Sequence, residues 1–335
     1  MVVKIGIPRT LFYYEYFPMA KVFFNELGIE VIISEKTSRE ILNLGIQKAH
    51  ADTCVPIKVF YGHVQSIKDN VDYLFIPRIT CLNGQTVYCP KFLAMSDIIR
   101  HALDDVPEII DNRIDVREHR FAVWNVFYNI GMRFTNSKLK VLKAYVKSLY
   151  ALKRYKGLLM QGLLPEQAMQ QLNNPKKIQT KVNSKTSLKF AVLGYPYTIY
   201  DEFTTVSLLS RLQELDVRTI TLEQIPYAWI KKQHKKLPKR MFWTYSDAIV
   251  KSALHFFEQK GVDGIIHITT FACGPDSMVT DYLKLEAQKH PDMPFMSITI
   301  DEHSGEAGIH TRIEAFVDMV KRKKIFTKNT GEVYS

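Results

Sequence analysis

The sequence feature that most limits the fold is an internal repeat. Residues 4–33 run from a short apolar stretch through a loop with Pro and Tyr into a helical pattern, and then into a second apolar stretch. Residues 189–221 follow the same order. A second pair of apolar stretches, at 71–77 and 262–268, is offset by about the same distance as the first pair, and each ends near a cysteine. The chain is therefore predicted to consist of two similar halves.

Apolar strands that alternate with helices predict an α/β fold in which parallel sheets are covered on both faces. We predict two similar Rossmann-like domains, with the first α/β domain at 1–110 and the second at 186–335. A helical bridge and basic linker would occupy 111–185. Ligands in such sheets bind at the carboxyl ends of the strands, so two such edges facing each other would form an interdomain cleft. Neither the dinucleotide-binding Gly-x-Gly-x-x-Gly nor a P-loop motif is present.

Composition narrows the class of protein further. Hydrophobic residues make up 46% of the 335 residues, which is enough apolar surface to exclude a disordered chain. We find no run of about 18 apolar residues that would predict a membrane span. The N-terminal stretch MVVKIGIP is interrupted too soon for a signal peptide. We therefore expect a cytoplasmic protein that does not associate with membranes.

The formal charge of +11 comes from one part of the chain. Residues 138–189 contain 12 Lys or Arg and a single acidic residue, Glu166. The simplest interpretation is a solvated basic face. Nucleic-acid binding is disfavoured because no finger, recognition-helix or aromatic RNA-binding signature accompanies the charge. An acidic partner protein or a polyanionic small molecule is the third alternative.

Four cysteines are too few for a disulfide scaffold, and they are Cys54, Cys81, Cys89 and Cys273. In all but Cys81, a Pro follows within two residues and a helical pattern begins there. Helix N-termini offer free N–H groups and positive potential, which stabilise a thiolate. Three such thiolates could hold a metal or an iron–sulfur cluster, and Cys81 could supply a fourth ligand. Their spacing matches neither a zinc motif nor a ferredoxin motif, so four buried, inert thiols remain the alternative.

Other residues are weaker candidates for function. Arg9 and Arg78 follow prolines at the predicted strand ends, where they could bind a substrate carboxylate or phosphate, or pair with local acids. Lys58 is a third candidate for substrate binding. Lys58 and Lys91 also follow cysteine turns, where they could compensate cluster charge. His63 is interpreted as a packed or surface histidine rather than a ligand.

Two candidates for proton transfer lie in the second half of the chain. Glu302 and His303 follow the predicted strand 295–300, at the position where a parallel-sheet site is expected. The alternative is that Ser304 and the residues after it simply begin the next helix. The aromatic-rich run at 12–17 is interpreted as packing rather than as a stacking platform.

Several blocks of sequence together resemble the acyl-CoA dehydratase activase-related proteins, relatives of the 2-hydroxyacyl-CoA dehydratase and benzoyl-CoA reductase subunits. The blocks cover nearly the whole chain, most weakly at 110–185, and they are 4–11, 54–63, 77–79, 89–92, 271–278 and 300–316. The resemblance implies two Rossmann-like halves with a [4Fe-4S] cluster between them, held by Cys54, Cys89 and Cys273. It also implies low-potential electrons delivered by an ATP-dependent activator of the actin-like ATPase type. Because no Asp-x-Gly-x-Thr phosphate loop is present, we expect no ATP binding by this chain.

Two functions from different classes follow. The first is an oxygen-sensitive iron–sulfur component of a dehydratase or reductase, which uses or relays electrons at an interdomain cluster. Its substrate would be an acyl-CoA or another small molecule, and a homodimer or a related subunit could complete the assembly. The second is a non-enzymatic two-domain binding or scaffold protein with a structural metal or none.

Overall fold

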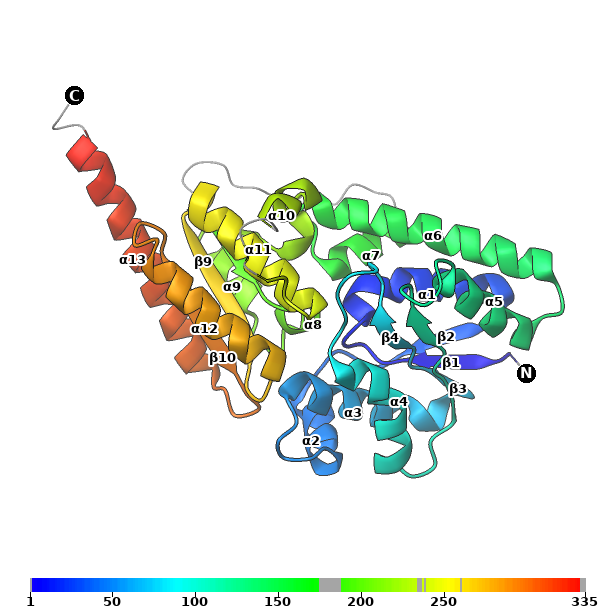
Figure 1. The fold of residues 1–335 in the computed structure, drawn as a ribbon. Helices are drawn as coiled ribbons and strands as arrows, with labels where there is room; N and C mark the ends of the chain where they lie inside the picture. The colour runs from blue at the N-terminus through cyan, green and yellow to red at the C-terminus, as the bar shows by residue number, and fades with distance from the viewer. Residues whose placement is uncertain (1, 175–187, 234–236, 238, 260, 332–335) are drawn as a thin grey trace. The chain divides into compact units, whose positions relative to one another are not determined.

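A computed structural model of the chain describes residues 2–174, 188–233, 237, 239–259 and 261–331 (Figure 1). The chain divides into two compact units. Unit 1 comprises Met1–Ile178 and Arg240–Asp247, and unit 2 comprises Gln179–Lys239 and Ala248–Ser335. The predicted domain boundaries at 110 and 185 stay a prediction. Most of the basic linker that was predicted to end at 185 lies outside the described residues.

Unit 1 is built on parallel strands with helices between them. Its elements are, in chain order, β1 (Lys4–Ile7), α1 (Tyr13–Leu27), β2 (Glu30–Ile33), α2 (Arg39–Lys48), α3 (Val55–Ile67), the 3-10 turn Lys68–Asn70, β3 (Tyr73–Phe75), β4 (Arg78–Cys81), α4 (Pro90–Ala102), β5 (Glu108–Ile110), β6 (Arg113–Asp115), α5 (Ala122–Phe134), α6 (Lys138–Met160) and α7 (Pro165–Asn173).

Four of these strands form a parallel sheet in the order β2-β1-β3-β5, and β4 pairs with β6 in a second parallel sheet. The register pairs Ile5 of β1 with Val31 on one side and with Tyr73 on the other. After β1 the chain first adds β2 on one side and then β3 on the other, so the switch point of the sheet lies between β1 and β3. In Figure 1, α1, α5 and α6 cover one face of this sheet and α3 and α4 the other.

Two glycines allow α2 and α3 to touch at the backbone. A Cβ atom on Gly45 would lie 1.8 Å from the carbonyl oxygen of Lys58, and one on Gly62 would lie 1.8 Å from that of Ile41. No side chain fits at either position, so glycine is required for this contact. Because α3 begins directly after Cys54, the contact also fixes the position of that cysteine.

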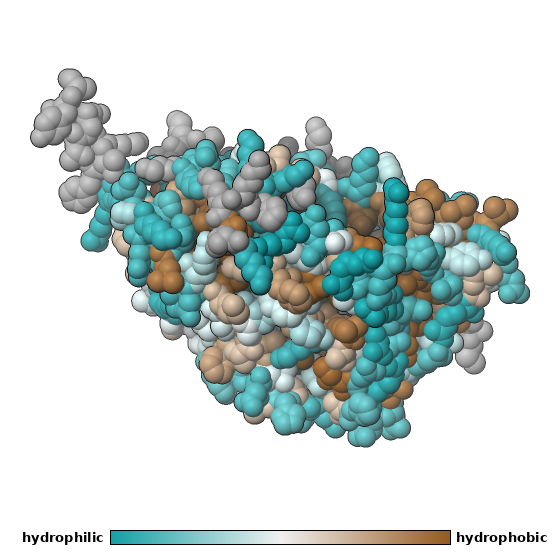
Figure 2. All heavy atoms as spheres, in the orientation of Figure 1, coloured by the Kyte–Doolittle hydropathy of each residue, from teal (hydrophilic) through white to brown (hydrophobic). Residues whose placement is uncertain are grey.

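Helix α6 explains where the basic charge lies. Its buried residues, including Val141, Ala144 and Tyr155, form one face, and the Tyr155 hydroxyl donates a hydrogen bond of 2.6 Å to the carbonyl of Tyr14 in α1. Most of its basic side chains are exposed on the other side. Figure 2 shows that hydrophobic side chains are also exposed, at the upper right of the view, over the N-terminal half of α6. The helix is therefore held to α1 by its apolar face, as its spacing predicts.

A short segment from the second half of the chain completes unit 1. Residues Arg240–Asp247 belong to unit 1 although the chain on both sides belongs to unit 2. Trp243 forms a parallel bridge with Val87, and the hydroxyls of Thr244 and Thr86 are 3.0 Å apart. The Tyr245 hydroxyl donates to Glu15 in α1.

Unit 2 repeats the plan of unit 1. Its elements are β7 (Leu188–Leu193), α8 (Pro196–Ile199), α9 (Leu208–Glu214), β8 (Val217–Ile220), the 3-10 turn Leu222–Gln224, α10 (Tyr227–Gln233), α11 (Thr244–Gln259, whose first turn belongs to unit 1), β9 (Gly264–Thr270), α12 (Gly274–Gln288), β10 (Phe295–Ile300) and α13 (Glu306–Gly331).

Its four strands are parallel and lie in the order β10-β9-β7-β8. The four-stranded sheet in unit 1 has the same order. In each sheet the first strand along the chain lies between the second and the third, and the fourth lies beside the third. All seven residues of β9 are buried, which is why this strand reads as a continuous apolar run. The predicted α/β fold with two similar parallel-sheet halves is confirmed.

The repeat is not perfect after the first strand. Unit 1 has the single helix α1 there, whereas unit 2 has the short helices α8 and α9. Val206 and Ser207, between the two short helices, adopt positive φ angles of 53° and 55°. A left-handed backbone at two consecutive residues cannot continue an α-helix, so the helical pattern is interrupted at this point.

Among the described residues, no helix combines the length and apolar character that crossing a membrane would require.

Candidate functional site

Three of the four cysteines occupy the same structural position. Cys54, Cys89 and Cys273 are the N-cap residues of α3, α4 and α12, and each helix has a Pro in its first two positions. A Pro there costs nothing, because the first N–H groups of a helix have no partner within the helix. Each of these cysteines thus stands at the positive end of a helix dipole.

Cys54 and Cys89 lie near each other in unit 1. The ammonium group of Lys91, on the first turn of α4, donates to the Cys54 sulfur at 3.7 Å. Burial raises the pKa of the Cys89 thiol, and the nearby Cys54 adds to the rise, while the N–H and ammonium groups of Lys91 oppose it. Two thiols and one cation therefore meet where two helices begin.

Cys273 is the counterpart of Cys89 in unit 2. Each follows the third strand of its four-stranded sheet and begins the helix that leads to the fourth strand. The Cys273 carbonyl accepts hydrogen bonds from the N–H and the hydroxyl of Ser277, at 2.9 and 2.8 Å. The first turn of α12 is thereby fixed. Cys54 has no cysteine counterpart in unit 2.

Cys81 is in a different environment. It is the last residue of β4 and is fully buried, and its thiol is 3.7 Å from the side-chain oxygen of Asn83. Its neighbour in the adjacent strand is Asp115, which accepts hydrogen bonds from the guanidinium groups of Arg113 and Arg117. Those arginines lower the pKa of Asp115 to about 2. A strand residue has no free helix N–H groups beside it, so Cys81 lacks the feature that the other three share.

The donor set in unit 1 fits a thiolate-bound group. Among the described residues, no three His, Cys, Asp or Glu side chains form a group that could hold a metal ion. Cys54 and Cys89 nevertheless supply two soft sulfur donors, which suit iron–sulfur clusters, and Lys91 supplies positive charge next to them. The assignment of Cys54, Cys89, Cys273 and Cys81 as ligands stays a prediction.

Both candidate arginines pair with local carboxylates. Arg9 lies 2.8 Å from Glu166 of α7. Arg78 forms a two-bond pair with Asp97, at 2.5 and 2.7 Å, and also donates to Asp111. These guanidinium groups are already neutralised where they stand, so a substrate anion would have to displace a carboxylate. Their role in substrate binding stays a prediction.

Lys58 and His63 lie inside unit 1. Lys58 is only 4% exposed, so it does not present its charge at the surface. His63 is fully buried, with Nδ1 at 2.8 Å from the hydroxyl of Ser34 and Nε2 at 3.0 Å from that of Thr37. Burial, with a smaller contribution from the charge of Arg9, lowers the pKa of His63 to about 3. This histidine is therefore neutral and packed, with both ring nitrogens hydrogen-bonded.

Glu302 and His303 lie in the turn between β10 and α13. His303 is exposed and Glu302 is half-buried. The carboxylate of Asp301 accepts hydrogen bonds from the N–H of His303, at 2.8 Å, and from the hydroxyl of Ser304, at 2.9 Å. Ser304 and Asp301 thus order the turn that precedes α13. A proton-transfer role for Glu302 and His303 stays a prediction.

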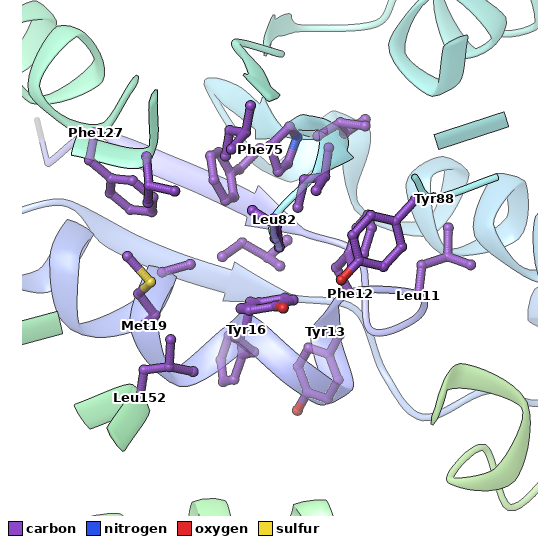
Figure 3. A pocket seen from close by; sticks show the side chains of 18 of the residues that line it. Leu11, Phe12, Tyr13, Tyr16, Met19, Phe75, Leu82, Tyr88, Phe127 and Leu152 are labelled. Atoms are coloured by element: carbon purple, nitrogen blue, oxygen red, sulfur yellow. The ribbon is translucent and has the colours of Figure 1, made fainter. Parts of the chain in front are cut away.

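Unit 1 contains a cavity of about 620 Å³ (Figure 3). It lies at the carboxyl ends of β1 and β3, because Ile7, Pro8 and residues 10–12 line it together with residues 75–77, and this is the switch point of the sheet. Helices α1, α5 and α6 supply further walls. In Figure 3 the side chains of Leu82 and Tyr88 face those of Tyr16 and Met19 across the space.

The cavity lining is mainly apolar and aromatic. Its polar groups include the hydroxyls of Tyr16 and Tyr88, which are hydrogen-bonded to each other. Two cations line it, Lys156 and Arg120, and both are exposed. Lys156 lies over the ring of Tyr16, with Nζ 5.3 Å from the ring centroid. None of the described lining residues is an Asp or a Glu.

Comparison with known protein families identifies the chain. The family model described as the CoA enzyme activase uncharacterised domain (DUF2229) matches residues 4–225. The chain belongs to this family. A second family model, the 2-hydroxyglutaryl-CoA dehydratase D-component, matches residues 197–320. The resemblance to dehydratase and activase-related proteins that the sequence indicates is confirmed.

The two matches divide the candidate residues between them. Cys54, Cys81 and Cys89 fall within the activase-domain match, as does the whole cavity lining except Thr244. Cys273 falls within the dehydratase match together with Glu302 and His303.

Comparisons with individual proteins add little. No curated protein matches the chain in sequence. Among solved structures, the periplasmic zinc-binding protein TroA from Treponema pallidum is similar to 96% of this chain over 98% of its own, at 8% identity and a TM-score of 0.31.

The cavity is the candidate site that the sequence interpretation missed. Residues 12, 13, 16 and 17, interpreted as packing, all line it, and Tyr13 and Phe17 are also buried in the core. A residue in a cavity wall can pack against the core on one side and line the cavity on the other. A usable signal is present in the sequence: an aromatic-rich run directly after the first strand of a parallel sheet lies where that sheet binds ligands.

Proposed function

We propose that this chain is an iron–sulfur component of the 2-hydroxyacyl-CoA dehydratase and reductase superfamily, with Cys54, Cys89 and Cys273 as ligands of a [4Fe-4S] cluster. The observation that carries the proposal is the meeting of Cys54, Cys89 and Lys91 at the N-termini of two helices. When bound, such a cluster supplies one-electron transfer at low potential.

The chain's own residues would prepare this site in three ways. The N-cap positions place the three cysteines at the positive ends of helix dipoles, which stabilise thiolate charge. Lys91 adds an ammonium group next to Cys54, which offsets part of the negative charge of a thiolate-bound cluster. The close α2–α3 contact through Gly45 and Gly62 holds the start of α3 in place.

The remaining candidates complete the proposal. Arg9, Arg78 and Lys58 would bind the anionic part of an acyl-CoA or another small substrate, the arginines by exchanging a protein carboxylate for a substrate anion. Glu302 and His303 would move a proton beside the substrate carbonyl. Cys81, which lies in a strand, would be the fourth ligand only if the cluster relays electrons rather than binding substrate.

The partner and the compartment follow from the same proposal. Electrons would come from a separate ATP-dependent activator of the actin-like ATPase type, while this chain itself binds no ATP. A second copy or a related subunit would complete the assembly. The protein would work in the cytoplasm, where its four free cysteines stay reduced. Within the chain, we propose an α/β domain at 1–110, a helical bridge and basic linker at 111–185, and a second α/β domain at 186–335.

Anaerobic reconstitution with iron and sulfide tests the proposal. We expect a brown protein with close to four iron and four sulfide per chain, and a reduced-cluster signal in electron paramagnetic resonance. Cys54→Ser, Cys89→Ser and Cys273→Ser should each lose most of the bound iron. Cys81→Ser is the matched control, because its thiol is buried but does not lie at a helix N-terminus.

Two outcomes would contradict the proposal. A wild-type protein that stays colourless and free of acid-labile sulfide would favour the non-enzymatic binding or scaffold protein. Equal iron retention in all four variants would exclude these thiols as the ligands.

A further inference from the structure

The cavity in unit 1 has the size and the position of a ligand site. It has about 620 Å³, a volume typical of small-molecule sites. It lies at the switch point between β1 and β3, where parallel sheets bind their ligands. Because the lining is mainly apolar, water inside it is readily displaced by an apolar molecule.

The shape of the cavity favours a linear ligand. Tyr145, Leu149, Leu152 and Lys156 of α6 line it, and the 11 residue steps from the first to the last of them span roughly 16 Å along the helix. An extended chain of about twelve carbon atoms, which advances about 1.2 Å per bond, spans roughly 13 Å and therefore fits within this length. In Figure 3 the lining runs from Phe127 and Met19 at one end to Leu11 and Tyr88 at the other.

The charges at the cavity select the end group of that ligand. Lys156 and Arg120 are its charged residues, both exposed, and neither forms an ion pair with a carboxylate among the described residues. Because no described acid lines the space, a cationic ligand would find no partner and would be repelled. An anionic group at the rim could bind the Lys156 ammonium, beside the Tyr16 ring that already holds it.

We propose that this cavity binds a linear aliphatic carboxylate of about twelve carbons, with its chain between α1 and α6 and its carboxylate at Lys156. The same acyl chain could arrive as a free fatty acid or as a thioester, and the free carboxylate is the form that the rim cation fits. The proposal does not depend on the iron–sulfur cluster.

Titration calorimetry of the full chain with dodecanoate tests the proposal. We expect saturable binding of one dodecanoate per chain, and much weaker binding of dodecylamine, which has the same chain and the opposite charge. Lys156→Gln should weaken dodecanoate binding about threefold to tenfold, the range for losing one partly exposed charged contact. Lys153→Gln is the matched control, since Lys153 is exposed on the same helix and does not line the cavity.

A second pair of variants tests the location of the chain. Leu152→Trp fills part of the cavity and should lower dodecanoate affinity at least tenfold. Leu158→Trp, on the same helix and outside the lining, should leave affinity unchanged. The Cys89→Ser protein, which would lack a cluster, should bind as well as the wild type, so this proposal and the iron–sulfur proposal fail separately.

Three results would overturn the inference: no saturable binding of dodecanoate, equal affinity for dodecanoate and dodecylamine, or unchanged affinity in Leu152→Trp. Binding of dodecanoyl-CoA without binding of dodecanoate would overturn the assignment of a free carboxylate.

Discussion

The neutral, buried His63 predicts a loss of stability in weak acid. Its pKa falls from the ordinary value of 6.5 to about 3 in the folded chain. The unfolded chain therefore takes up a proton below pH 6.5, whereas the folded chain stays neutral until about pH 3. Stability that is fully present above pH 6.5 is lost as the pH falls below that value.

The size of this effect can be calculated for a drop from pH 7 to pH 4.5. A pH of 4.5 is two units below the pKa of the unfolded histidine. Protonation of the unfolded chain then favours unfolding by about 2.7 kcal/mol, compared with about 0.2 kcal/mol at pH 7. The wild type should thus lose about 2.5 kcal/mol of unfolding free energy through this one group. Asp111 and Asp115 contribute little to this change, because their pKa values fall from 3.8 to about 2 on folding, so the stability they supply is lost only as the pH falls from 3.8 towards 2.

Urea unfolding of the wild type and of His63→Gln, followed by circular dichroism at both pH values, measures the effect. Glutamine cannot take up the proton, so the stability difference between the two proteins should shrink by about 2.5 kcal/mol at pH 4.5. His50→Gln, at an exposed position, should follow the wild type at both pH values. Parallel pH dependence of the wild type and His63→Gln would refute the assignment of His63 as a neutral buried group.

Three further predictions concern stability and are all checked by denaturant unfolding. Gly62→Ala should lower the free energy of unfolding by about 1–3 kcal/mol or more, because the added Cβ atom would lie 1.8 Å from a backbone oxygen of α2. Gly157→Ala in α6, where a Cβ atom would have nothing within 4 Å, should instead leave the free energy of unfolding unchanged or raise it by up to about 1 kcal/mol. Asp115→Asn should cost about 1.5–3 kcal/mol at pH 7 by weakening hydrogen bonds to two arginines. That difference should disappear as the pH falls from 3.8 towards 2, where the wild-type carboxylate also becomes protonated. Tyr155→Phe should cost about 1 kcal/mol by leaving the buried carbonyl of Tyr14 without this donor, and a loss below 0.3 kcal/mol would count against that contact.

Much of the fold could be predicted because buried parallel strands have a simple sequence pattern. β7 and β9 are buried almost throughout, and they read as apolar runs at the same offset from β1 and β3. The N-cap positions of Cys54, Cys89 and Cys273 were also predictable, since a Pro in the first turn identifies a helix start.

The rest depends on contacts between distant segments, which local patterns do not encode. No local signal pairs Arg9 with Glu166, or Arg78 with Asp111, although these pairs decide whether either arginine is available to a substrate. The cavity was missed for the same reason, because its walls come from α1, α5, α6 and two strand ends together.

The assignment of residues 240–247 to unit 1 affects how the chain can be made. A fragment that stops at residue 178 would lack the hydrogen bond that the Tyr245 hydroxyl donates to Glu15, and it would lack the bridge between Trp243 and Val87. On the ribosome, the N-terminal half therefore cannot reach its finished form until some 70 more residues have emerged. If the two halves are expressed separately, the first half should therefore be incomplete. A rearranged chain in which residues 240–247 stay joined to the first half would keep unit 1 complete.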